Sequence, residues 1–130
     1  MDRQRLATHG FLAGIPDAEL DAVAAAAAER TFAAGDTLMT EGDFGHALFL
    51  VEEGSAEVSA DGARLASVGP GEVIGEVAVL ASGRRTATVV ATTEMRVMAF
   101  FKRDVWALEQ QAPEAARRLR AAIDERAARA

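Results

Sequence analysis

Three segments with different patterns of apolar and polar positions follow one another along the chain. Residues 1–30 place apolar side chains at helical spacing, residues 31–101 consist of short apolar runs divided by glycine-containing turns, and residues 102–130 return to helical spacing. Turns at such short intervals are typical of strands rather than helices. We therefore predict an N-terminal helical segment, a β region and two C-terminal helices.

Proline and alanine mark the predicted helices. Pro16-Asp17 is typical of a helix start, with Asp17 or a neighbour available as the cap. The alanine-rich run 22–28 favours a helix packed closely on the β region, because alanine allows close approach without loss of side-chain entropy. Pro113 suits the first turn of a helix. The closing helices should span residues 103–110 and 113–129.

The middle segment should form a small antiparallel barrel or jelly roll. Ala56, Val58 and Ala60 alternate with polar residues, so one face of this strand should point inward. Asp61-Gly62 follows directly and is a strong signal for a tight hairpin. A second strand should therefore pair with the first.

Length, composition and charge narrow the classes of function. A chain of 130 residues, half of them apolar, suits a single domain with one core. The net charge of −6, from 14 basic and 20 acidic residues, argues against a dedicated nucleic-acid surface. There is no cysteine, the alanine-rich run is too short to cross a bilayer, and no signal core follows the first residues. We expect a soluble, cytoplasmic protein without a membrane or nucleic-acid partner.

The segment 71–89, GEVIGEVAVLASGRRTATV, carries the candidate chemistry. Gly75 lets its backbone approach a ligand, and residues 76–80 can form a helical turn whose N–H groups attract an anion. Arg85 offers a planar fork that matches two phosphate oxygens. Glu76 cannot serve a phosphate and should accept from a hydroxyl. A phosphate beside a ribose hydroxyl satisfies both side chains.

Residues 74–80 and 85–89 resemble the phosphate-binding cassette of the cyclic nucleotide-binding domain family, which includes regulatory subunits of cyclic-AMP-dependent kinase, cyclic-nucleotide-gated channels and the bacterial catabolite activator protein. Four upstream segments resemble the successive strands and turns of that family: Phe32–Leu38, Glu41–Asp43, Leu48–Val51 and Glu53–Val58. The resemblance covers most of the chain. It implies one domain over 1–130, mainly β: an eight-stranded antiparallel β-roll with N-terminal helices, a short cassette helix and two C-terminal helices.

The resemblance also implies a set of ligand-binding residues. Glu76 would accept from the ribose 2′-hydroxyl, Arg85 would bind the phosphate, and the backbone N–H groups after Gly75 would support it. The final helix would close over the base and allow a homodimer contact. The expected ligand-binding residues are Val73, Ile74, Gly75, Glu76, Val77, Ala78, Arg85, Thr86 and Ala87, with Leu119, Arg120 and Ile123 as the lid.

Thr86 leaves the base preference open, because threonine after the phosphate arginine occurs in members that respond to either nucleotide. We favour cyclic AMP over cyclic GMP. The leading hypothesis is a regulatory module that transmits occupancy through its C-terminal helices to an effector or a fused domain. The alternative is the same fold serving as a protein-interaction domain without nucleotide.

Catalysis is the third hypothesis, and the residues argue against it. A metal-dependent enzyme would need a cluster of imidazoles, whereas the chain has only His9 and His46. No nucleophile is paired with a histidine near the cassette, so we expect neither a cofactor nor enzymatic activity.

Overall fold

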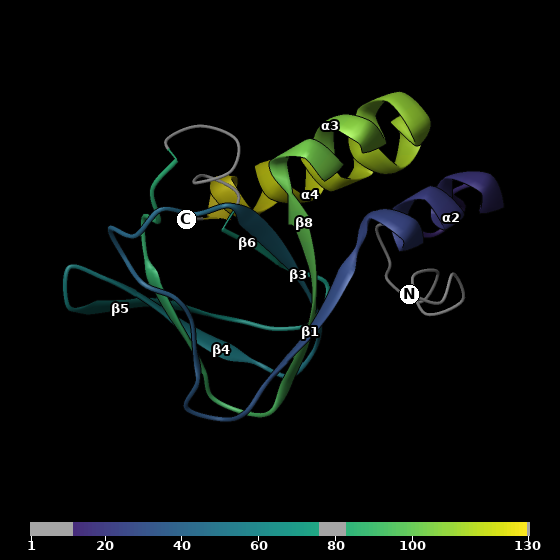
Figure 1. Ribbon diagram of the computed structural model, residues 1–130. Helices are drawn as coiled ribbons and strands as arrows, with labels where there is room; N and C mark the ends of the chain where they lie inside the picture. Colours follow the sequence, from purple (N-terminus) through teal and green to yellow (C-terminus); the bar gives the residue numbers. More distant parts are fainter. Residues whose placement is uncertain (1–11, 76–82, 130) are drawn as a thin grey trace.

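The computed structural model describes residues 12–75 and 83–129, with side chains described as far as residue 121 (Figure 1). Strands dominate the middle of the chain and helices flank it, as the sequence predicts. In chain order the elements are α2 (Asp17–Ala26), β1 (Ala28–Phe32), β2 (Thr37–Met39), β3 (Ala47–Glu53), β4 (Ala56–Ala60), β5 (Ala63–Val68), β6 (Val73–Ile74), β7 (Thr88–Ala91), β8 (Met95–Phe101), α3 (Lys102–Gln111) and α4 (Pro113–Arg129).

The eight strands form two four-stranded sheets, with strand orders β1-β8-β3-β6 and β2-β7-β4-β5. Every pairing within them is antiparallel. This arrangement confirms the predicted eight-stranded antiparallel β-roll. The predicted cassette helix, which begins at Glu76, lies outside the described residues.

The sheet that contains β3 is covered on both faces. Leu48 and Leu50 belong to a core cluster shared with the helices, whereas Phe49 and Val51 belong to a second cluster between the two sheets. Since successive side chains of a strand point to opposite faces, both faces must be apolar, and the first five residues of β3, 47–51, form an unbroken apolar run.

The three helices gather on one side of the strands, and β4 and β5 lie on the other side (Figure 1). Leu20 of α2, Val105 of α3 and Leu119 of α4 all join the cluster that covers the outer face of β3 and β8. The buried residues of α4 therefore pack on its own domain. None of the described helices combines the length and apolar character needed to cross a membrane.

The start of β1 differs from the prediction. Helix α2 ends at Ala26 and β1 already begins at Ala28, three residues before the expected boundary at residue 31. Ala28 pairs with Ala99 of β8, so this long-range ladder overrides the helical preference of alanine. The predicted capping by a side chain is also wrong, because Pro16 is the N-cap and Asp17 is already inside the first turn.

The predicted hairpin between β4 and β5 is confirmed. Asp61 and Gly62 both have positive φ values, 53° and 78°, as a tight turn of this hand requires. Ala60 pairs with Ala63 across the turn. The inward face of β4 consists of Ala56 and Val58, while Ala60 at the turn is only half-buried.

Candidate functional site

Gly75 directly follows β6, at a point where another side chain would not fit. Its φ of 82° lies in the left-handed region, which glycine adopts without steric cost. A Cβ at this position would lie 2.5 Å from Nη1 of Arg85 and 3.1 Å from Cε of Met39. The missing side chain is what allows the arginine to reach the backbone here.

Arg85 is buried at this turn, with 8 % of its surface exposed. Its Nη1 donates to the Gly75 carbonyl at 3.1 Å and its Nη2 donates to the Ala47 carbonyl at 2.8 Å. The guanidinium carbon also lies 5.7 Å from the centroid of the Phe49 ring. The structure thus brings Arg85 and Gly75 together, as the sequence predicts.

The positive charge of Arg85 is stabilised by the dipoles of two backbone carbonyl groups, those of Gly75 and Ala47. Burial lowers the pKa of Arg85 from its ordinary value, and a guanidinium still stays protonated in proteins. Within residues 12–75 and 83–129, no carboxylate forms an ion pair with this side chain. A buried charge is costly unless an opposite charge compensates it, so an anion placed against Arg85 would be stabilised.

The backbone of Arg85 is held by the loop between β2 and β3. Its N–H donates to the Asp43 carbonyl at 2.8 Å, and its carbonyl accepts from the Gly42 N–H at 2.9 Å. Because β7 starts only at Thr88, Arg85 precedes the strand and depends on this loop for its position.

Ala47 and Phe49, at the start of β3, are contacts of the Arg85 side chain that the sequence did not predict. Ala47 contributes only a carbonyl oxygen, which every residue type carries, so nothing in its identity could have indicated the contact. Phe49 lies two residues further along β3 and has the sequence context of an ordinary core residue. Both residues reach Arg85 only because the fold brings β3 next to the segment that contains Arg85.

The other predicted ligand residues have different surroundings. Val73 and Ile74 are buried in β6, where they pair with Leu50 and Phe49 of β3. Thr86 is exposed and Ala87 is half-buried against the cluster between the sheets. Glu76, Val77 and Ala78 lie outside the described residues. Ligand contact by all of these residues stays a prediction.

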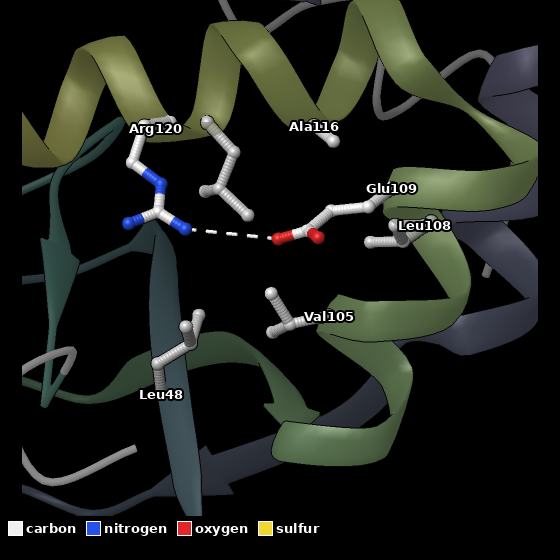
Figure 2. A pocket seen from close by; sticks show the side chains of 7 residues that line it. Leu48, Val105, Leu108, Glu109, Ala116 and Arg120 are labelled. Atoms are coloured by element: carbon white, nitrogen blue, oxygen red, sulfur yellow. Dashed lines mark ion pairs between the residues drawn. The ribbon is translucent and has the colours of Figure 1, made fainter. Parts of the chain in front are cut away.

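Two of the predicted lid residues, Leu119 and Arg120, lie where α4 packs against α3. Leu119 is buried in the core, and Nη2 of Arg120 lies 3.6 Å from Oε1 of Glu109 on α3. Figure 2 shows Arg120 reaching from α4 towards Glu109 across a small hollow above Leu48. In this arrangement both residues serve the contact between α3 and α4. The Ile123 side chain is not described, and the lid role stays a prediction.

Comparison with known proteins agrees with the fold. The model of the family described as "Cyclic nucleotide-binding domain" matches residues 29–112. The cyclic AMP receptor protein of Thermus thermophilus is 31 % identical over 118 residues, which cover 87 % of this chain and 55 % of that protein. A cyclic-GMP-dependent protein kinase, isozyme 2, of Drosophila melanogaster is 35 % identical over 62 % of this chain and 7 % of the kinase.

A solved structure matches nearly the whole chain. It is the crystal structure of the N-terminal domain of a transcriptional regulator from Streptomyces coelicolor A3(2), with 36 % identity and a TM-score of 0.71 over 99 % of this chain and 92 % of that one. By contrast, the chain spans about half of the Thermus protein and a small part of the kinase. With the family match extending from β1 to the end of α3, this chain belongs to the cyclic nucleotide-binding domain family.

Proposed function

We propose that this domain binds a 3′,5′-cyclic nucleotide, with cyclic AMP favoured over cyclic GMP, and reports its occupancy through α3 and α4. The observation that carries the proposal is the buried guanidinium of Arg85 beside Gly75, which faces no carboxylate within the described residues. A cyclic phosphate brings one negative charge and two free oxygens, and a planar guanidinium can bind both oxygens at once.

The residues after Gly75 supply the rest of the proposed site. Glu76 follows it directly in the sequence and would accept a hydrogen bond from the ribose 2′-hydroxyl, the one ribose hydroxyl that a 3′,5′-cyclic phosphate leaves unesterified. The backbone N–H groups of Glu76, Val77 and Ala78 would donate to the phosphate. Ile74 and Ala87 would form the apolar surroundings of the nucleotide, with Val73 supporting β6 from the helix side of the sheet, and Thr86 would be positioned to contact the base.

Cyclic AMP is favoured because of the extent of the matches. The relative that is called a cyclic AMP receptor covers 87 % of this chain, whereas cyclic-GMP-dependent kinases cover 49 to 71 %. Thr86 is exposed, so its hydroxyl can reach a ligand, and a threonine hydroxyl can hydrogen-bond either purine. Direct competition between the two nucleotides decides the preference.

The path by which ligand binding would affect the helices starts at the Ala47 carbonyl, which accepts a hydrogen bond from Arg85. Ala47 accepts from Arg85, and the next residue, Leu48, packs against Val105 and Leu108 of α3. A phosphate that draws the guanidinium towards itself would loosen the bond to Ala47 and change the support under α3. Coupling of this kind typically amounts to about 1 to 3 kcal/mol. Leu119, Arg120 and Ile123 would respond as the lid, and α4 would offer the homodimer contact.

The proposed role is regulation in the cytoplasm and not catalysis, with an effector protein or a fused domain as the recipient of the signal. The family is a nucleotide-binding family, and the match covers residues 29–112 of this chain. The regulated partner would be a protein or domain that binds differently to the nucleotide-free and the nucleotide-bound arrangement of α3 and α4.

The test is calorimetric titration of the chain with cyclic AMP, cyclic GMP and 5′-AMP, followed by the same titrations of Arg85→Ala. Loss of the arginine should cost about 2 to 5 kcal/mol, or roughly thirtyfold to several thousandfold in Kd, because the phosphate charge loses its partner in a confined site. Thermal denaturation of each variant verifies folding. Binding of 5′-AMP as tight as that of cyclic AMP, or unchanged affinity in Arg85→Ala, would contradict the proposed site.

One observation supports the alternative of a protein-interaction domain without nucleotide. Arg85 joins Gly75 to Ala47 by two hydrogen bonds, so it also has a structural use that needs no ligand. That use predicts a lower melting temperature for Arg85→Ala without any cyclic nucleotide binding by the wild type. A folded wild-type domain that gives no heat with either cyclic nucleotide would select this alternative.

A further inference from the structure

Phe44 is a large hydrophobic side chain that the core does not use. It is 66 % exposed in the loop between β2 and β3, and the guanidinium carbon of Arg84 lies 4.2 Å from the centroid of its ring. Nη1 of Arg84 also donates to the Gly42 carbonyl at 2.9 Å. The arginine side chain therefore lies over the aromatic ring and is anchored to the same loop.

Phe44 and Arg84 are also paired through the backbone. They form an isolated antiparallel bridge, flanked on one side by the Gly45 N–H, which donates to the Gly83 carbonyl at 3.0 Å. On the other side are the two bonds that hold Arg85, from its N–H to Asp43 and from Gly42 to its carbonyl. The side-chain pair thus covers the short ladder that fixes the backbone of Arg85.

We propose that Phe44 and Arg84 are positioning residues for Arg85: their cation–π contact holds the loop 42–45 against residues 83–85, so that the guanidinium of Arg85 is already in place before a ligand arrives. The proposal rests on the proposed function in so far as Arg85 binds the phosphate. Neither Phe44 nor Arg84 needs to touch the nucleotide for this effect.

The physical reason is that the apparent affinity depends on the fraction of molecules in which Arg85 is already positioned to bind. Arg85 must keep its backbone in the ladder for Nη1 and Nη2 to reach the carbonyls of Gly75 and Ala47. When only a fraction of the population is competent, the apparent affinity falls by that fraction. A contact that closes the loop over residues 83–85 raises the competent fraction without adding any ligand contact.

Three replacements of Phe44 separate the aromatic face from simple bulk. Phe44→Ala and Phe44→Leu should each weaken cyclic AMP binding about two- to fivefold, the change that an exposed cation–π contact corresponds to. Phe44→Trp should bind as the wild type does, because its ring offers Arg84 a better face. The matched control is Leu65→Ala on β5, which removes another side chain that is 62 % exposed and should leave the affinity unchanged.

A second measurement observes Arg85 without any ligand. Nitrogen-15 relaxation of the Arg85 Nε–H group should report an ordered side chain in the wild type and in Phe44→Trp, and a clearly more mobile one in Phe44→Ala. The Nε–H of the exposed Arg64, on β5, serves as the internal control and should not change. This measurement stands even if the wild type binds no cyclic nucleotide, so the failure of the proposed function can be distinguished from the failure of this proposal.

The outcomes are decisive in both directions. Loss in the alanine and leucine variants, rescue by tryptophan and increased mobility of Arg85 would support positioning through the aromatic face. Unchanged Arg85 relaxation in Phe44→Ala would overturn the proposal whatever the affinities are. If leucine rescued binding as well as tryptophan did, the effect would come from bulk and not from the cation–π contact, and the proposal would also be overturned.

Discussion

Replacing Gly75 with alanine should weaken ligand binding more than it weakens the fold. The new Cβ would lie 2.5 Å from Nη1 of Arg85 and 3.3 Å from the carbonyl oxygen of Ala47. Nη1 is the far end of a flexible side chain, so the guanidinium can move away while the backbone stays in place. The domain should therefore fold, with Arg85 displaced from the position that we propose for phosphate binding.

The two costs can be estimated separately. Alanine at a φ of 82° costs about 1 to 2 kcal/mol, which corresponds to a fall of roughly 3 to 10 °C in Tm for a domain of this size. Displacement of the guanidinium removes charge-assisted hydrogen bonds to the ligand of about 1.5 to 3 kcal/mol, or roughly 10- to 100-fold in Kd.

Gly71→Ala is the matched control for this experiment. Gly71 has a φ of 87°, but a Cβ there would meet no atom within 4 Å. Both variants should lose the conformational part of the stability in thermal denaturation, and Gly75→Ala should lose somewhat more, because Arg85 gives up its bonds to Gly75 and Ala47. Only Gly75→Ala should lose affinity in calorimetric titration with cyclic AMP. Equal affinity losses in the two variants, or none in Gly75→Ala, would refute the idea that the approach of Arg85 to Gly75 controls binding.

Two further predictions concern stability. Glu19→Ala should destabilise the domain by about 1 kcal/mol, because Oε1 of Glu19 accepts from the N–H groups of Glu114 and Ala115 in the first turn of α4, at 2.9 and 3.0 Å. Glu19→Gln keeps an acceptor oxygen and should retain most of the stability in thermal denaturation. Equal losses of stability in the alanine and glutamine variants would argue against this capping role. Gly54→Ala should cost about 2 to 5 kcal/mol in chemical denaturation, because its Cβ would overlap the Glu94 carbonyl oxygen and lie 2.9 Å from Cα of Met95 at a φ of +89°. Gly62→Ala, with a φ of +78° and no atom within 4 Å, should cost only the conformational part, and a similar loss in both glycine variants would contradict this reasoning.

Much of the fold could be predicted because its signals are local. Asp61-Gly62 tolerates the positive φ values of a tight hairpin, and Pro113 begins α4 as predicted. The unbroken apolar run of β3 is explained by burial on both faces of its sheet. The start of β1 could not be predicted, because Ala28 is extended only through its pairing with Ala99 of β8.

The candidate site was predictable in part. The approach of Arg85 to Gly75 followed from a glycine turn and an arginine that are ten positions apart, within one family-like segment. The bond from Arg85 to Ala47 spans 38 positions and ends on a backbone carbonyl. The cation–π pair of Phe44 and Arg84 joins two loops in the same way. Such contacts arise only when distant strands are brought into register.

The sequence by itself determined the class of fold, the order of its strands and turns, and the pairing of an arginine with a glycine turn. These features depend on residue type and on spacing over a few positions, which govern backbone conformation and side-chain chemistry directly. The tertiary structure decided which carbonyls hold Arg85, where β1 begins, and that Leu119 and Arg120 pack between α3 and α4. Those outcomes depend on long-range strand pairing and helix packing, in which backbone groups without residue identity take part and local preference is overridden.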